Sequence, residues 1–151
     1  MLKKIKKNLE SNMLNKLPVN FVKFLYAIPK IILKSYYGFE EWHLSSYRFR
    51  PYAKAIVEYA NKKYKRGSVL EIGCGLGSII RRLNYKTKLG YDNNNNVLDA
   101  ARLIGKFLNY SKTSLVYEYF DITEKNNLVG EFDLILMPNF AHGIPQSIIK
   151  D

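Results

Sequence analysis

The stretch "VLEIGCGLG", residues 69–77, decides the fold. It begins as an apolar run interrupted by Glu71, and it then places Gly73, Gly75 and Gly77 at every second position. A short apolar run of this kind predicts a buried strand. Glycines placed so closely behind it indicate a loop whose backbone must come near a ligand, because side chains there would obstruct that approach.

The chain around this stretch alternates between two kinds of periodicity. Apolar runs and helical spacing predict strands at 69–72, 88–92, 114–120 and 132–137, and helices over 51–64, 76–83 and 97–108. Alternating strands and helices predict an α/β fold, in which helices flank a parallel sheet of about four strands. Ligands of such sheets bind at the carboxyl ends of the strands, which is where the glycines lie.

Composition favours one globular domain without a metal site. The chain has 151 residues, of which 47% are hydrophobic and 25% charged, with one cysteine and two histidines. A single cysteine cannot form an intramolecular disulfide, and no cysteine–histidine cluster has metal-ligand spacing. We therefore expect a cytoplasmic protein with no bound metal.

Positive charge is concentrated at the start of the chain, where residues 1–38 carry eight lysines against one acid. We interpret residues 1–38 as a basic amphipathic helical arm and residues 39–151 as the ligand-binding domain. Pro29 is expected to kink the arm helix or to break it in two. Three interpretations of the arm remain open: it lies on the inner face of an anionic membrane, it packs on the domain or on a second copy with its lysines in water, or it contacts nucleic acid.

Three smaller features also carry expectations. The polar and aromatic cluster before residue 51 either covers a ligand or forms a capped surface turn, and it comprises Trp42, His43, Tyr47, Arg48 and Arg50. Cys74 is expected to be an inert buried residue of the loop. Asp133 is expected to be structural, because it lies near the start of its strand and away from the ligand end.

The glycine spacing excludes two common phosphate-binding loops. A dinucleotide fingerprint needs glycines at positions one, three and six, whereas the third glycine here falls at position five when Gly73 is position one. The segment also lacks the Gly-Lys-Ser/Thr ending of a P-loop. The pattern that remains is Glu-x-Gly-x-Gly-x-Gly.

Four segments together resemble the class I S-adenosylmethionine-dependent methyltransferases, over roughly residues 52–149. They are "VLEIGCGLG" (69–77), "LGYD" (89–92), "YFDI" (119–122) and "FDLILMPN" (132–139). The resemblance implies a Rossmann-like fold with S-adenosylmethionine as the cofactor. Its cofactor-binding positions correspond to Glu71, Gly73, Gly75, Gly77, Asp92, Asn93, Asp121, Ile122 and Asn139.

The resemblance assigns the two aspartates different parts of the cofactor. The carboxylate matching Asp92 accepts hydrogen bonds from both ribose hydroxyls, and the acid matching Asp121 takes the adenine amino group, with Ile122 on the purine face. Glu71 would favour a cationic ligand. Alternatives that need no ligand are that Asp92 caps the next helix and that Asp121 is a turn residue before Thr123.

The segment after residue 137 is where the family approaches the transferred methyl group. His142 is the candidate catalytic residue, since a neutral histidine can remove a proton from the acceptor; the alternative is an ordinary loop histidine. We expect a small-molecule, lipid or glycan acceptor. A nucleic acid is less expected, because the core is only mildly basic and "MPNF" (137–140) lacks the Asn/Asp-Pro-Pro-aromatic pattern.

The family's sheet has seven strands, whereas this chain supplies four. The strand at 132–137 is therefore expected to be an exposed apolar edge, of a kind that invites pairing. We expect a fragment of a longer protein; the alternatives are that a second copy or another chain covers the edge, or that the arm folds over it. The alternative function is a catalytically inactive methyltransferase-like binding module.

Overall fold

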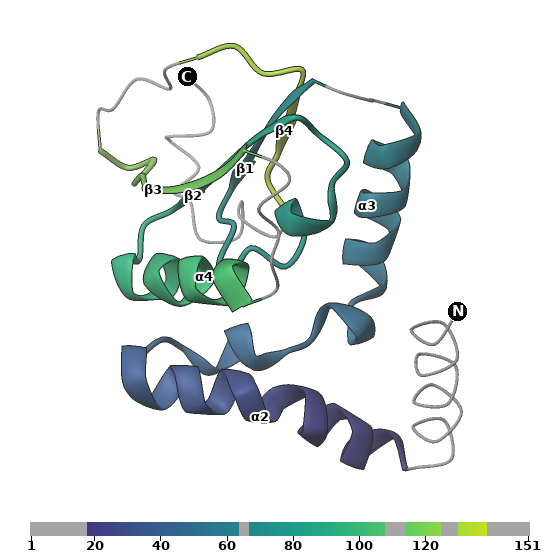
Figure 1. Ribbon diagram of the computed structural model, residues 1–151, viewed down its shortest axis with the longest axis vertical. Coiled ribbons are helices and arrows are strands. Elements are labelled where there is room, and N and C mark those ends of the chain that lie inside the picture. Colours follow the sequence, from purple (N-terminus) through teal and green to yellow (C-terminus); the bar gives the residue numbers. More distant parts are fainter. Residues whose placement is uncertain (1–17, 64–66, 108–113, 125–129, 139–151) are drawn as a thin grey trace.

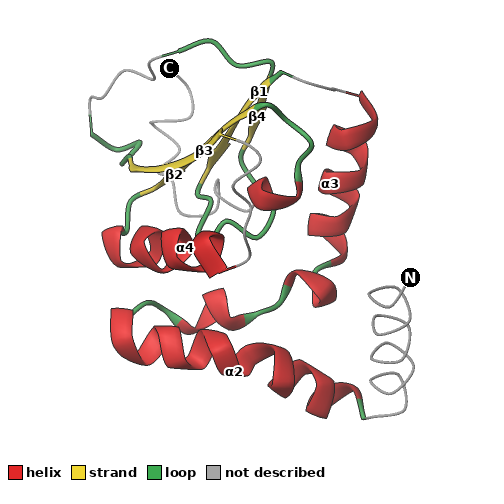
Figure 2. Cartoon of the chain, viewed as in Figure 1, coloured by secondary structure: helices red, strands yellow, loops and turns green. Residues whose placement is uncertain are grey.

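The computed structural model describes residues 18–63, 67–107, 114–124 and 130–138 (Figure 1). Its elements in chain order are α2 (Val19–Tyr37), η1 (Glu41–Leu44), η2 (Tyr47–Phe49), α3 (Pro51–Lys63), β1 (Ser68–Ile72), η3 (Ile80–Arg82), β2 (Thr87–Asp92), α4 (Asn95–Phe107), β3 (Ser114–Tyr119) and β4 (Leu134–Leu136). The η elements are short 3₁₀ helices. Figure 2 shows the sheet in yellow, with α3 and α4 beside it and α2 beyond α4.

The four strands form one parallel sheet in the order β3-β2-β1-β4, which confirms the predicted α/β architecture. The chain moves outward from β1 to β2 and β3, and then returns to the other side of β1 with β4. The strand order therefore reverses next to β1. In open parallel sheets this is where a crevice forms outside the carboxyl ends of the strands.

Both faces of the sheet bury side chains. Neighbouring residues on a strand point to opposite faces, and accordingly Val69 and Leu70 belong to separate clusters, although each is fully buried. The Val69 cluster joins β1 to α3, η3 and α4. The Leu70 cluster includes Tyr91 and Phe120, whose rings stack with centroids 4.8 Å apart.

The prediction of a helix over residues 76–83 is wrong, since only the single 3₁₀ turn η3 forms there. Gly73, Gly75 and Gly77 have φ of 71°, 53° and 67°, a left-handed conformation that no α-helix contains. Helical bonding can begin only beyond them. The N–H of Ile80 then donates to the Glu71 carboxylate at 2.9 Å, so it does not close a helical turn.

Helix α2 continues through Pro29 as one helix, so the chain does not break there. It ends at Gly38, which has φ 71° and donates its N–H to the Lys34 carbonyl oxygen at 2.7 Å. Leu33 and Tyr37 pack against the buried cluster that contains Phe39. None of the helices in the described part of the chain is long and apolar enough to cross a membrane.

Lys30 and Lys34 of α2 bond to the residues that follow the helix. Lys30 Nζ donates to the carbonyl oxygens of His43 and Ser45 at 3.0 and 2.7 Å. Lys34 Nζ forms an ion pair with Glu41 at 2.8 Å. The opposite side of the helix leaves large apolar side chains exposed, namely Ile28, Ile31, Ile32 and Tyr36.

Strand β4 is an edge strand among the described residues, as predicted, and Ile135 is half exposed. The described part of α2 packs on α4 and η1, so it does not cover this edge. Asp133 ties the start of β4 to β1, because its Oδ2 accepts from the N–H and the hydroxyl of Ser68 at 2.6 and 3.0 Å. These bonds lower the pKa of Asp133 and confirm its structural role.

Candidate functional site

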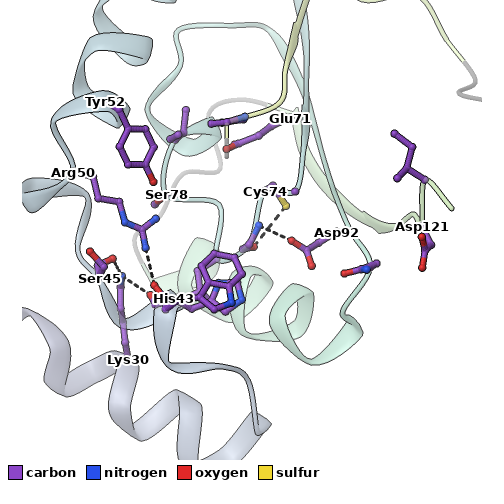
Figure 3. Close-up of a pocket in the computed structure, with 18 of the residues that line it drawn as sticks. Lys30, His43, Ser45, Arg50, Tyr52, Glu71, Cys74, Ser78, Asp92 and Asp121 are labelled. Atoms are coloured by element: carbon purple, nitrogen blue, oxygen red, sulfur yellow. Dashed lines mark hydrogen bonds between the residues drawn. The ribbon is translucent and has the colours of Figure 1, made fainter. Parts of the chain in front are cut away.

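A cavity of about 580 Å³ lies at the carboxyl ends of the strands, against the glycine loop (Figure 3). This volume falls within the range of small-molecule sites. Seven of the predicted cofactor residues line it: Glu71, Gly73, Gly75, Asp92, Asn93, Asp121 and Ile122. Asn139, another predicted cofactor residue, and His142, the candidate catalytic residue, lie outside the described residues.

The structure shows why glycine is needed at positions 75 and 77, which the sequence alone did not reveal. A Cβ on Gly75 would lie 2.9 Å from Nδ1 of His43, so the imidazole ring occupies the space that this glycine leaves. A Cβ on Gly77 would lie 2.1 Å from the hydroxyl oxygen of Tyr117. Gly77 is buried and does not line the cavity, and its missing side chain leaves room for Tyr117 of β3 under the loop.

Asp92 ends β2 and holds the glycine loop. Its Oδ2 accepts from the N–H of Gly75 at 2.8 Å, and its Oδ1 accepts from the N–H of Asn94 at 3.2 Å. The cap of α4 is Asn94, whose Oδ1 accepts from the N–H groups of Asn96 and Val97 at 3.0 and 3.3 Å. Burial raises the pKa of Asp92, although these backbone bonds oppose the shift. Asp92 is thus a buried acceptor in the wall of the cavity.

Asp121 follows β3 and is a turn residue that also lines the cavity. Its Oδ1 accepts from the N–H and the hydroxyl of Thr123 at 2.8 and 2.7 Å, which makes it a turn residue. These bonds lower its pKa and keep it ionised. It also lines the cavity, on the same side as Asp92 (Figure 3).

Glu71 is the most strongly perturbed acid of the cavity. It is 2% exposed, and burial raises its pKa to about 8 despite the hydrogen bond from Ile80. The positive charge of Arg81 lowers the pKa in part. Glu71 therefore holds a proton at neutral pH, and a cationic ligand in the cavity would favour its ionised form.

The wall opposite these acids comes from the N-terminal part of the chain. The rings of Trp42 and His43 lie in contact, tilted by 30° with centroids 3.5 Å apart, and both residues line the cavity together with Lys30 and Arg50. Of the cluster expected either to cover a ligand or to form a surface turn, Trp42, His43 and Arg50 thus line the cavity, whereas Tyr47 packs against Arg82. Burial lowers the pKa of His43 to about 4, so its ring is neutral.

Sequence reasoning missed Lys30 as a cavity residue. Its place depends on how α2 docks on α4 and η1, and no local pattern signals that. Cys74 agrees with its expected inert role: burial raises the pKa of its thiol, and its Sγ lies 3.6 Å from the carbonyl oxygen of Gly75. Among the described residues, no group of histidine, cysteine and carboxylate side chains could hold a metal ion.

Solved structures with the same fold include methyltransferases, although no protein-family model and no curated protein matches the sequence. The methyltransferase domain of bacterial CtHen1-C is 14% identical, with a TM-score of 0.56, and the match covers 66% of this chain and 54% of that one. Magnesium protoporphyrin IX methyltransferase from Synechocystis PCC 6803, solved with bound S-adenosylmethionine, is 17% identical, with a TM-score of 0.54 and coverage of 64% and 47%.

A third structure, the YcgJ protein from Bacillus subtilis, is 16% identical, with a TM-score of 0.51 and coverage of 60% and 38%. The chain thus corresponds to roughly half or less of the length of each of these three proteins. Together with the strand order, the matches establish the fold as the Rossmann-like fold of S-adenosylmethionine-dependent methyltransferases.

Proposed function

We propose that this chain binds S-adenosylmethionine in the cavity and supplies the cofactor half of a methyltransferase. The observation that carries the proposal is the convergence of Glu71, Gly73, Asp92 and Asp121 on one cavity, at the reversal of strand order. These are the positions that the family's motif assigns to the cofactor. The methyltransferases of the same fold support it, including the Synechocystis enzyme crystallised with this cofactor.

Each acid of the cavity has a place in this proposal. Asp92 is a buried acceptor at the end of β2, suited to the ribose hydroxyls, and charged acceptors form the stronger hydrogen bonds. Asp121 and Ile122 form the adjoining wall for the adenine. Glu71 is protonated at pH 7 and would become a counter-charge when a cation binds, so binding is expected to release a proton.

The bound cofactor would supply a methyl group already activated by its sulfonium, so the protein's task is mainly to align the acceptor. The acceptor that we propose is a small molecule, a lipid or a glycan. His142 would remove a proton from it where the acceptor atom carries one. The second candidate function is a binding module that transfers no methyl group. It would use the same cavity for the cofactor and would lack a site for the acceptor.

Isothermal titration calorimetry of the 151-residue chain tests the proposal. S-adenosylmethionine and S-adenosylhomocysteine are expected to bind with micromolar affinity, about 8 kcal/mol. NAD is the control and is expected not to bind, because the loop lacks the dinucleotide spacing. A folded chain that binds neither of the first two ligands would refute the proposed function.

We further propose that the outer face of α2 touches an anionic membrane. Ile28, Ile31, Ile32 and Tyr36 are exposed along one side of the helix, and the preceding residues 1–16 are rich in lysine. Apolar insertion combined with basic charge is how peripheral helices bind anionic lipid. Co-sedimentation with phosphatidylserine vesicles, but not with phosphatidylcholine vesicles, is expected for the chain and should be lost in Ile32→Ser.

A further inference from the structure

The cavity has a cationic wall that the cofactor motif does not explain. Lys30 reaches it from α2 and Arg50 from the residue before α3, and both line the cavity. In Figure 3 they lie on one side of His43, whereas Asp92 and Asp121 lie on the other. The cavity therefore has an acidic side at the strand ends and a basic side formed by the N-terminal elements.

Both cations keep donors for a ligand. Lys30 gives two of its three N–H groups to the carbonyl oxygens of His43 and Ser45. Arg50 Nη2 donates to the carbonyl oxygen of Trp42 at 3.0 Å, which uses one of five N–H groups. These contacts with backbone oxygens hold both head groups in the wall without neutralising their charge.

The surroundings of this wall are positive. Burial and the charges of Arg50, Arg81 and Arg82 lower the pKa of Lys30 to about 8. Glu71, which also lines the cavity, is neutral at pH 7, because burial raises its pKa to about 8. No ion pair to a carboxylate forms at Lys30 or Arg50 in the described part of the chain. An anion entering the cavity would therefore be attracted to this side.

We propose that Lys30 and Arg50 form a subsite for the carboxylate or phosphate group of an anionic methyl acceptor, an assignment that rests on the proposed function. S-adenosylmethionine carries two positive charges and one carboxylate. Because its net charge is positive, it neutralises the positive charges of Lys30 and Arg50 poorly. An acceptor with an anionic group complements both Lys30 and Arg50, and their fixed donors would orient it beside the glycine loop.

Tryptophan fluorescence gives a direct readout, because Trp42 is the only tryptophan of the chain and lines the cavity. Inorganic phosphate would be titrated at constant ionic strength into the chain saturated with S-adenosylhomocysteine. We expect saturable binding that Lys30→Gln and Arg50→Gln each weaken about tenfold or more, since a hydrogen bond to a charged group is lost. Lys54→Gln, an exposed site on α3, removes the same charge and serves as the control.

The source of the anion is decided by a second titration. The cofactor product S-adenosylhomocysteine has a carboxylate, whereas 5′-methylthioadenosine keeps the nucleoside and lacks the amino-acid part. If the subsite serves the acceptor, both variants bind the two nucleosides within about twofold of the unmodified chain. A loss of affinity for S-adenosylhomocysteine alone would assign the subsite to the cofactor carboxylate and overturn the proposal.

The remaining outcomes also separate the two proposals. Absence of saturable phosphate binding in the presence of S-adenosylhomocysteine would overturn the subsite and leave the proposed function intact. Failure of S-adenosylhomocysteine itself to bind would overturn the proposed function, and with it the assignment to an acceptor. Circular dichroism of each variant shows whether it is folded, and either Lys30→Gln or Arg50→Gln suffices for the test if the other fails to fold.

Discussion

Replacing Glu71 by glutamine should remove a pH dependence from the stability of this protein. The carboxyl group is buried in the cavity wall, where its Oε2 accepts from the N–H of Ile80. Glutamine has nearly the same shape, keeps an oxygen for this bond and stays neutral at every pH. The substitution therefore changes the titration of the site while leaving its packing largely intact.

The direction of the effect follows from the raised pKa. In the folded protein Glu71 keeps its proton up to about pH 8, whereas the ordinary value for the unfolded chain is 4.5. The stability that the neutral carboxyl contributes is fully present below 4.5 and is lost as the pH rises to about 8. One proton corresponds to about 1.4 kcal/mol per pH unit, so this group alone should lower the free energy of unfolding by roughly 3 kcal/mol between pH 5 and pH 7.

Urea unfolding at pH 5, 6 and 7 measures this difference. The free energy of unfolding of the unmodified chain should fall relative to that of Glu71→Gln, so that the two curves diverge with rising pH. Glu58→Gln, an exposed site on α3, is the control for the loss of an acid and should run parallel to the unmodified chain. Parallel curves for Glu71→Gln as well would refute the conclusion that Glu71 is protonated in the folded protein.

Three further predictions concern the loop and the arm. Asp92→Ala should weaken S-adenosylmethionine binding at least about tenfold, or about 1.4 kcal/mol, because a buried acceptor is lost; unchanged affinity by calorimetry would exclude the ribose assignment. Gly77→Ala should destabilise the fold by about 2–5 kcal/mol in urea unfolding, because its positive φ strains an L-residue and its Cβ would meet Tyr117; wild-type stability would contradict the packing argument. Deletion of residues 1–38 should lower the free energy of unfolding and weaken phosphate binding, because it removes Lys30 and the packing of α2 on α4 and η1; unchanged phosphate binding by a folded product would show that the arm is independent of the cavity.

Matched controls isolate each of these effects. Asp99→Ala removes an exposed aspartate of α4 and should leave cofactor affinity unchanged. Gly105→Ala places a methyl group within α4 where nothing lies within 4 Å, so it should stabilise the helix by about 0.5–1 kcal/mol. A truncation of residues 1–17 retains α2 and should preserve the cavity.

Local patterns were enough to predict the four strands and the acids at or near the carboxyl ends of three of them. The apolar runs before Glu71, Asp92 and Asp121 determine strands, and parallel strands bring their carboxyl ends to one edge of the sheet. The acids therefore meet there whatever the details of packing. The same reasoning failed for residues 76–83, because it counted apolar spacing and ignored that three left-handed glycines delay the start of a helix.

The sequence by itself thus determined the sheet, the glycine loop and the acidic side of the cavity, because these depend on periodicity and on backbone conformation within a few residues. Only the tertiary structure decided which side chains line the other side of the cavity, across from the acids. Lys30 enters the wall because Leu33 and Tyr37 dock α2 against the Phe39 cluster, and Gly77 must be glycine because the Tyr117 hydroxyl fills its space. Such contacts join segments far apart in the chain, so they follow from how the elements pack together and leave no local signal in the sequence.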